Sequence, residues 1–160
     1  MDVKEYRESF LNELRFQAEH EETVPEEIWD LPVSGEIGLP FAPKELVYFQ
    51  TLEEWATHPG VDILGEESSP VKAIMAGKVK STKLDPRYGY TIVIEHQNGY
   101  ESVYSNLSTL DLVYVGQEVA KGEIISGVGK GLGFEAKEKP HVHLELSYLG
   151  EMIDPTKEKK

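Results

Sequence analysis

Cysteine is absent from this chain. The protein therefore has no disulfide framework, no thiolate nucleophile and no cysteine-based zinc site. Histidine is scarce as well, with 5 residues among 160. A metal ion held by this chain must be bound by histidine, aspartate and glutamate side chains. The length suits one domain of ordinary size with a hydrophobic core.

Long apolar runs are also missing, and no stretch approaches the roughly 18 residues needed to span a membrane. The first residues lack the basic start and apolar middle of a secretory signal peptide. We therefore expect no membrane segment in the chain as given. An anchor or leader before residue 1 stays an open alternative.

Basic residues are few, with 16 Lys and Arg against 29 Asp and Glu, for a formal net charge of -13. This balance argues against nucleic acid and anionic membrane surfaces as partners. It also fits poorly with close adhesion to an anionic cell wall. Acidic residues are concentrated at the N-terminus, where residues 1–30 carry ten acidic and three basic side chains.

An amphipathic helix is predicted near the N-terminus, from about Lys4 to Glu19. Tyr6, Phe10 and Leu14 recur every four residues there, and the acidic side chains fall largely at other positions. The apolar stripe would pack on the domain or on a partner helix. A solvated helical leader that follows an anchor is an equally open alternative.

An irregular connector follows this helix. Residues 31–43 contain five turn-forming residues, namely Pro32, Gly35, Gly38, Pro40 and Pro43. The composition therefore predicts two parts: an N-terminal helix and connector over residues 1–45, and a domain over residues 46–160.

The domain from residue 46 onward is predicted to be all-β, because short extended segments alternate with glycine and turn residues. The expected strands are residues 47–50, 70–75, 77–82, 90–96, 100–106, 112–115, 123–128 and 141–148, with a short turn or helical piece over 52–57. Asn98-Gly99 predicts a β-hairpin between two of these strands, since a type I′ turn needs positive φ at both central residues.

Two histidines stand two positions apart in the last predicted strand. Alternate side chains of a strand share a face, so His141, His143 and Glu145 point one way while Val142 and Leu144 point into the core. One imidazole can hold a metal while the other acts on a water beside it, provided that further ligands come from elsewhere. An isolated HxH pair has an alternative explanation as two strand histidines with no shared task.

A second histidine motif supplies the missing partners. His58 and Asp62 are four residues apart, and Pro59-Gly60 between them favours a turn over a helix. His58, Asp62 and one histidine of the HxH pair would give two nitrogen ligands and one oxygen ligand. Such a set leaves a fourth tetrahedral position open, which is typical of catalytic zinc sites.

These two motifs together resemble the HxxxD and HxH motifs of the lysostaphin/LytM-type zinc metallopeptidases, which cleave peptide cross-links in bacterial cell walls. Further segments are similar to the scaffold of that family, namely Pro70–Ala73, Gly77–Val79, Tyr88–His96, Val115–Ile124 and Asp154-Pro155. The resemblance covers roughly residues 46–156.

The resemblance implies a small antiparallel β-domain, barrel-like, with a groove across its main sheet and a zinc ion at the groove floor. It implies that His58, Asp62 and His143 are the zinc ligands and that His141 is the general base or transition-state stabiliser. We expect Glu145 to support the site and His96 to be structural.

One position departs from the family pattern. Active members carry a second catalytic histidine in a Tyr-x-His-Leu segment, and here Asn106 stands at that place, after Tyr104. An amide can donate a hydrogen bond, but it cannot accept and return a proton near neutral pH.

Two functions therefore stay open. The first is a zinc endopeptidase that acts on peptidoglycan peptides with reduced turnover. The second is an inactive protein-binding module. It resembles the LytM domain of stage II sporulation protein Q, which docks to a partner, stage III sporulation protein AH. Either function implies an extracytoplasmic location, at the cell surface or in the intermembrane space of a sporulating cell, with a membrane anchor in the full-length protein.

Overall fold

The computed structural model describes residues 2–12, 29–130 and 138–157. Contacts separate Trp29–Glu158, which holds all of the described strands, from the N-terminal unit that contains Met1–Ile28. Residues 3–12 form a helix, and Asp2 caps it by accepting a hydrogen bond from the Glu5 amide at 2.8 Å. The helix predicted from Lys4 to Glu19 is confirmed this far; its second half lies outside the described residues.

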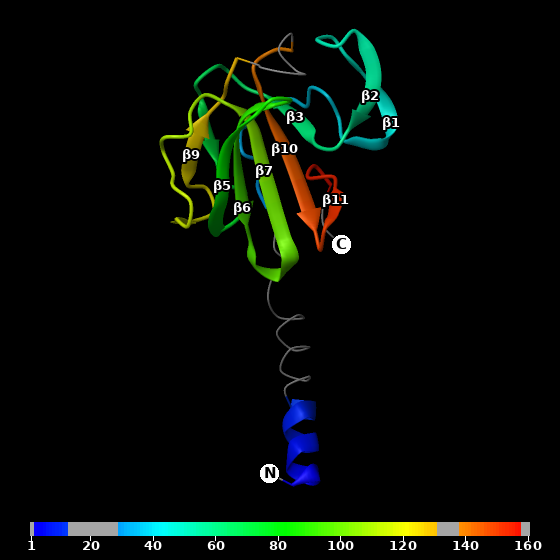
Figure 1. The fold of residues 1–160 in the computed structure, drawn as a ribbon, viewed down its shortest axis with the longest axis vertical. Helices are drawn as coiled ribbons and strands as arrows, with labels where there is room; N and C mark the ends of the chain where they lie inside the picture. Colours follow the sequence, from blue (N-terminus) through cyan, green and yellow to red (C-terminus); the bar gives the residue numbers. More distant parts are fainter. Residues whose placement is uncertain (1, 13–28, 131–137, 158–160) are drawn as a thin grey trace. The chain divides into compact units, whose positions relative to one another are not determined.

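The described strands form three antiparallel sheets (Figure 1). Their bounds are β1 (Ala42–Phe49), β2 (Glu54–His58), β3 (Val61–Leu64), β4 (Pro70–Lys72), β5 (Gly77–Asp85), β6 (Gly89–Glu95), β7 (Tyr100–Leu107), β8 (Glu118–Val119), β9 (Ile124–Gly127), β10 (His141–Tyr148) and β11 (Glu151–Ile153). The main sheet has the order β11-β10-β7-β6-β5-β8, with β3 also paired to β10, while β1–β2 and β4–β9 form two small sheets. The predicted all-β fold with an N-terminal helix is confirmed.

Strand β10 is the centre of the arrangement that positions the site. It pairs with β7 along one edge, and along the other edge with β3 over its first half and β11 over its second half. Figure 1 shows β10, in orange, beside β7. The side chains that β10 sends inward, Val142, Leu144 and Leu146, are fully buried in the core. The alternation expected from the sequence is therefore present.

The hydrophobic core lies beneath the main sheet. Burial of apolar side chains is the main stabilising term of such a core. Trp29 and Val33 pack on it, although both precede the predicted boundary at residue 45. The domain division stays a prediction, and the structure adds that part of the connector is fastened to the β-domain. No helix among the described residues is long and apolar enough to cross a membrane.

The hairpin predicted at Asn98-Gly99 is confirmed. Strands β6 and β7 are paired, and Asn98 and Gly99 have φ of 65° and 86°. The strand expected over residues 112–115 is wrong, because this segment is a loop that buries only Val113 and leaves Leu112 and Tyr114 exposed. Residues 54–58 form strand β2, where a turn or helical piece was expected over 52–57, and the turn is confined to residues 50–53.

Candidate metal centre

The predicted site residues on β10 are brought against β3 and β7. His143 lies directly opposite Asp62 of β3 on one side and Ser105 of β7 on the other. Cross-strand partners have Cβ atoms about 4.5–5.5 Å apart, which explains why His143 and Asp62 meet. Both side chains are buried, as is that of His141.

His58 reaches the same place through the turn at Pro59-Gly60. Strand β2 ends at His58 and β3 begins at Val61, and the two residues between them form a bend. Gly60 is required there because a Cβ atom at this position would lie 2.4 Å from the Leu144 carbonyl oxygen on β10. A bend thus brings His58 and Asp62 together where a turn was expected, and the close approach to β10 explains its glycine.

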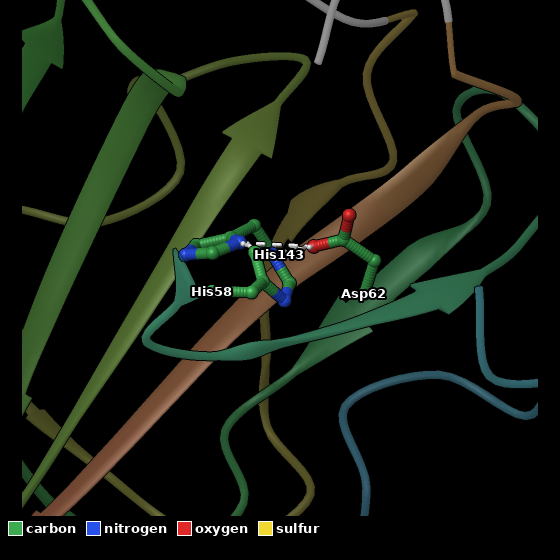
Figure 2. Close-up of side chains that lie close together, drawn as sticks. All are labelled: His58, Asp62 and His143. Carbon is green, nitrogen blue, oxygen red and sulfur yellow. Dashed lines mark hydrogen bonds and ion pairs between the residues drawn. The ribbon is translucent and has the colours of Figure 1, made fainter. Parts of the chain in front are cut away.

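Three atoms converge at this point (Figure 2). The distance from His143 Nδ1 is 2.9 Å to Asp62 Oδ1 and 3.2 Å to His58 Nε2, and His58 Nε2 lies 3.3 Å from Asp62 Oδ1. Ligands at the usual distances from tetrahedral zinc lie roughly 3.3–3.6 Å from one another. The three atoms are therefore grouped much as ligands of a single small ion would be.

Hydrogen bonds on the far side of each ring set the tautomers. The Nδ1–H of His58 donates to the Pro40 carbonyl at 2.9 Å, because a carbonyl oxygen can only accept. In the same way the Nε2–H of His143 donates to Glu145 Oε2 at 2.9 Å. In the neutral rings, His58 Nε2 and His143 Nδ1 then carry lone pairs that point toward Asp62. Such outer hydrogen bonds are typical of metal-binding histidines.

The donor set fits a divalent cation. Two lone pairs and a carboxylate oxygen within hydrogen-bond distance repel one another in a buried place unless a cation or protons lie among them. Among the described residues, His58, Asp62 and His143 are the group of histidine and acidic side chains that could hold a metal ion. Nitrogen and oxygen ligands of this kind suit zinc.

Asp62 also has a second oxygen aimed away from this group. Among the described residues, Asp62 Oδ2 is the buried side-chain polar atom with no hydrogen-bond partner, and it lies 3.7 Å from His141 Nε2. The Nδ1–H of His141 donates to the Lys139 carbonyl at 2.6 Å, so Nε2 is the acceptor in the neutral ring. The geometry thus separates His141 from the three converging residues, although the assigned roles stay predictions.

Asn106 lies beside the start of β10, and its side-chain amide donates hydrogen bonds to two backbone carbonyls. Its Nδ2 donates to the carbonyls of His141 at 2.8 Å and Gly129 at 3.3 Å. Its φ is 60°, a conformation that asparagine tolerates better than most residues. The side chain is buried. Asn106 therefore ties β7 to the strand that carries the two histidines.

Two of these histidines pack against aromatic rings. The sequence analysis did not identify these rings as part of the site. The Tyr88 ring stacks on His143 with centroids 4.1 Å apart and planes 9° apart. Phe49 packs edge-on against His58 at 5.6 Å. Tyr88 was recognisable only as part of a scaffold segment. No signal in the sequence marks the carbonyls of Pro40 and Lys139 as partners of histidine rings.

His96 lies in a separate buried network. Its Nδ1–H donates to the Ala76 carbonyl at 2.8 Å, and its Nε2 lies 2.7 Å from Ser102 Oγ, which is 2.8 Å from the Tyr104 hydroxyl. The Ile74 amide donates to Tyr104 at 3.0 Å. Burial raises the pKa of Tyr104 to about 12, so this hydroxyl stays protonated. These contacts agree with the expected structural role of His96.

The fold and the converging histidine and aspartate side chains define a β-domain with a group that could hold a metal ion where β2 and β3 meet β10. Residues 56–155 match Peptidase family M23, and the chain belongs to this family.

Known relatives include a carboxypeptidase/endopeptidase and an outer membrane lipoprotein. The chain is 30% identical over 104 residues to the DD-carboxypeptidase/endopeptidase Mpg of Neisseria meningitidis, covering 65% of this chain and 23% of that protein. It is 29% identical over 131 residues to the outer membrane antigenic lipoprotein B of Haemophilus influenzae, covering 81% of this chain and 29% of that protein. The chain thus spans less than a third of the length of either relative.

Solved structures share the fold. A zinc-containing peptidase from Vibrio cholerae has a TM-score of 0.70 and 28% identity, with 84% of this chain and 41% of that one covered. In a complex of SpoIIIAH and SpoIIQ, the matching chain has a TM-score of 0.61 and 26% identity, with 82% of this chain and 93% of that one covered.

Proposed function

We propose that this chain is a zinc-binding M23 endopeptidase domain that acts on peptides of bacterial peptidoglycan with low turnover. The observation that carries the proposal is the convergence of His58 Nε2, Asp62 Oδ1 and His143 Nδ1 within 2.9–3.3 Å of one another. These three atoms would hold the ion. When bound, zinc supplies a Lewis acid that polarises a carbonyl and lowers the pKa of water to roughly 7.

His141 would handle the proton. Its Nε2 is the acceptor atom of the neutral ring, because Nδ1–H is held by the Lys139 carbonyl. A proton taken up at Nε2 creates an imidazolium 3.7 Å from Asp62 Oδ2, whose negative charge stabilises it. Asp62 would thus serve two neighbours, with one oxygen toward the ion and the other toward His141.

Asn106 limits the rate in this proposal. The family places a second proton-transferring histidine there, whereas the Asn106 amide donates to two backbone carbonyls. Loss of a general acid or base typically costs about 100- to 10,000-fold in rate. His141 alone would therefore sustain slow turnover.

The relatives support the substrate class and the location. Mpg is named as a DD-carboxypeptidase and endopeptidase, the solved Vibrio cholerae protein as a zinc-containing peptidase, and a further relative from Vibrio cholerae as a peptidoglycan DD-endopeptidase. Lipoprotein B is named as an outer membrane protein. We infer that this chain works outside the cytoplasm and that the full-length protein is anchored to a membrane.

A second candidate function is an inactive protein-binding module. The amide of Asn106 in place of a proton carrier favours it, and so does the likeness to a chain in a SpoIIIAH–SpoIIQ complex. The partner would then be a protein domain similar to stage III sporulation protein AH, in the intermembrane space of a sporulating cell.

The decisive experiment compares the wild type with Asn106→His for zinc content and for hydrolysis of purified peptidoglycan. Asn106→Ala is the matched control, because it removes the same two hydrogen bonds without adding a titratable ring. We expect zinc in all three proteins, slow cleavage by the wild type and at least 10-fold faster cleavage by Asn106→His alone.

Other outcomes separate the two candidates. Zinc without any cleavage by the wild type, together with complex formation with a partner domain, would establish the binding module. Fast cleavage by the wild type would contradict the limiting role of Asn106. A wild type that binds no zinc would overturn the proposed site.

A further inference from the structure

A short piece of the connector, residues 35–40, lies along the edge of β3 opposite the edge that pairs with β10. Ile37 forms an antiparallel bridge with Ile63 of β3. Beside this bridge the Leu64 amide donates a hydrogen bond to the Glu36 carbonyl at 2.8 Å. The 35–40 segment therefore pairs with β3 in the manner of a short additional strand.

Both backbone polar groups of Asp62 bond to this segment. The Gly38 amide donates to the Asp62 carbonyl at 2.7 Å, and the Asp62 amide donates to the Leu39 carbonyl at 2.9 Å. In an antiparallel ladder the N–H and C=O of one residue point to the same side, so Asp62 and its β10 partner His143 are a pair without mutual backbone hydrogen bonds. The backbone of Asp62 is thus held from the connector side.

The next residue of the segment holds the ring of a second converging side chain. The Pro40 carbonyl accepts from His58 Nδ1–H at 2.9 Å, which turns Nε2 toward Asp62. His58 and Asp62 are buried, although most of the 35–40 segment is exposed. Three consecutive connector residues therefore support two of the three atoms that would hold the ion.

Glycine at position 35 allows this close approach. A Cβ atom on Gly35 would lie 1.7 Å from the Leu64 carbonyl oxygen, so only glycine fits without moving one backbone away from the other. The chain is also fastened just before the connector, where Trp29 Nε1–H donates to the Pro155 carbonyl at 2.7 Å. The connector is thus attached to the β-domain before it reaches the metal centre.

The match to Peptidase family M23 begins at residue 56, so the 35–40 segment lies outside the matched residues. We propose that Gly38, Leu39 and Pro40 are positioning residues of the metal centre, which hold the Asp62 backbone and the His58 ring in the arrangement that binds zinc. The inference rests on the proposed zinc site. Because coupling between two sites is reciprocal, bound zinc in turn holds the segment on β3.

Two substitutions at Gly38 isolate one of these contacts. Gly38→Pro removes the N–H that donates to Asp62, and Gly38→Ala is the matched control that keeps it. Both variants add a Cβ atom, which would lie 3.1 Å from Cδ2 of the flexible Leu64 side chain. Competition with a chelator on the full chain should give a zinc dissociation constant at least about 10-fold higher for Gly38→Pro and within about 3-fold of the wild type for Gly38→Ala.

The wild-type chain supplies a second measurement that needs no variant. Amide hydrogen exchange is followed by NMR with saturating zinc and with a chelator. By reciprocity, zinc should slow exchange of the Gly38 amide by at least about 10-fold. The Lys72 amide is the matched control, because its hydrogen bond to the Pro32 carbonyl, at 3.0 Å, joins the connector to β4 and not to a metal-site residue. Its exchange should change by less than about 2-fold.

Equal zinc affinity in Gly38→Pro and Gly38→Ala would overturn the inference, and so would equal effects of zinc on the Gly38 and Lys72 amides. If Gly38→Pro fails to fold, the exchange measurement decides alone. A wild type that binds no zinc would overturn the inference together with the proposed site.

Neither measurement needs turnover, so the inference and the proposed activity can fail separately. Weaker zinc binding by Gly38→Pro in a chain that does not cleave peptidoglycan would contradict only the activity. Cleavage by the wild type without any difference between the two Gly38 variants would contradict only the positioning role of the segment.

Discussion

Two buried polar clusters in this domain, one around His96 and one around His143, differ in how their hydrogen-bond donors and acceptors are matched. Around His96, donors and acceptors alternate from the Ile74 amide through Tyr104 and Ser102 to the Ala76 carbonyl. Around His143, the outer ring nitrogen donates to Glu145, while the inner one faces the acceptor oxygen of Asp62. Burial alone therefore does not distinguish a histidine in a matched hydrogen-bond network from one in a candidate metal site.

The difference lies in the direction of the lone pairs. A buried network with matched donors and acceptors contributes to stability, whereas acceptors that face one another cost free energy until a cation joins them. The Pro40 carbonyl and the Glu145 carboxylate hold the His58 and His143 rings in this arrangement without metal. This contrast predicts that zinc affinity depends on the residues around His143, while the free energy of unfolding depends on the network around His96.

The largest expected effect is the loss of zinc on changing His143 to Gln. His143→Gln should weaken zinc binding by more than about 100-fold, beyond the 10–100-fold typical of residues that only support a ligand. His141→Gln is the matched control, since this residue is on the same strand and equally buried. It should stay within about 10-fold of the wild type. Competition with a chelator of known affinity measures both; equal losses would remove the distinction between the two histidines.

A smaller effect, on stability, is expected in the cluster around His96. Zinc affinity should not change. Ser102→Ala removes the link between His96 and Tyr104 and should lower the free energy of unfolding by about 1–3 kcal/mol. Urea denaturation in the presence of a chelator measures it. Ser81→Ala, at a partly exposed position of β5, should change stability by less than about 0.5 kcal/mol. A drop in zinc affinity in Ser102→Ala would mean that the two clusters are coupled.

The smallest effect is expected on the pH dependence of stability, at Asp85 before the turn that leads to Tyr88. Burial would raise the pKa of Asp85, but hydrogen bonds from the Arg87 side chain and from the Arg87 and Tyr88 amides outweigh it and lower that pKa. Because the folded-state pKa is the lower one, Asp85 stabilises the protein fully above its unfolded pKa of about 3.9, and this stability is lost as the pH falls through the folded value.

Asp85→Asn keeps a carbonyl acceptor and removes the charge. Its deficit in the free energy of unfolding should be less than about 1 kcal/mol at pH 7 and should shrink as the pH falls below 4. Denaturation curves of both proteins across pH measure it. A deficit that grows on acidification would contradict the assigned direction of the pKa.

The sequence predicted the elements with strong local signals. Strand β10 has the bounds expected from the alternation in His141–Tyr148, and the Asn98-Gly99 hairpin has the expected positive φ values. Strand β3 was missed because four residues after Pro59-Gly60 show too little periodicity. The strand predicted over residues 112–115 was wrong because a loop anchored by one buried valine can have the composition of a strand.

The side chains of the candidate site could be predicted from the sequence, but the backbone carbonyls that bind them could not. His58, Asp62 and His143 are recognisable from spacing and family resemblance, and the structure brings them together. The carbonyls of Pro40 and Lys139 come from chain segments whose composition gives no sign of the contact. Asn106 could be recognised as a departure, but its two bonds to backbone carbonyls depend on how β7 approaches β10.

The central claim is that the acceptors converging at His143 are a zinc site. An anomalous difference map recorded at the zinc edge from crystals of the wild-type protein tests it most directly. The account predicts one peak per chain among His58 Nε2, Asp62 Oδ1 and His143 Nδ1. A zinc-soaked crystal with no peak there, or with its peak at other residues, would contradict it.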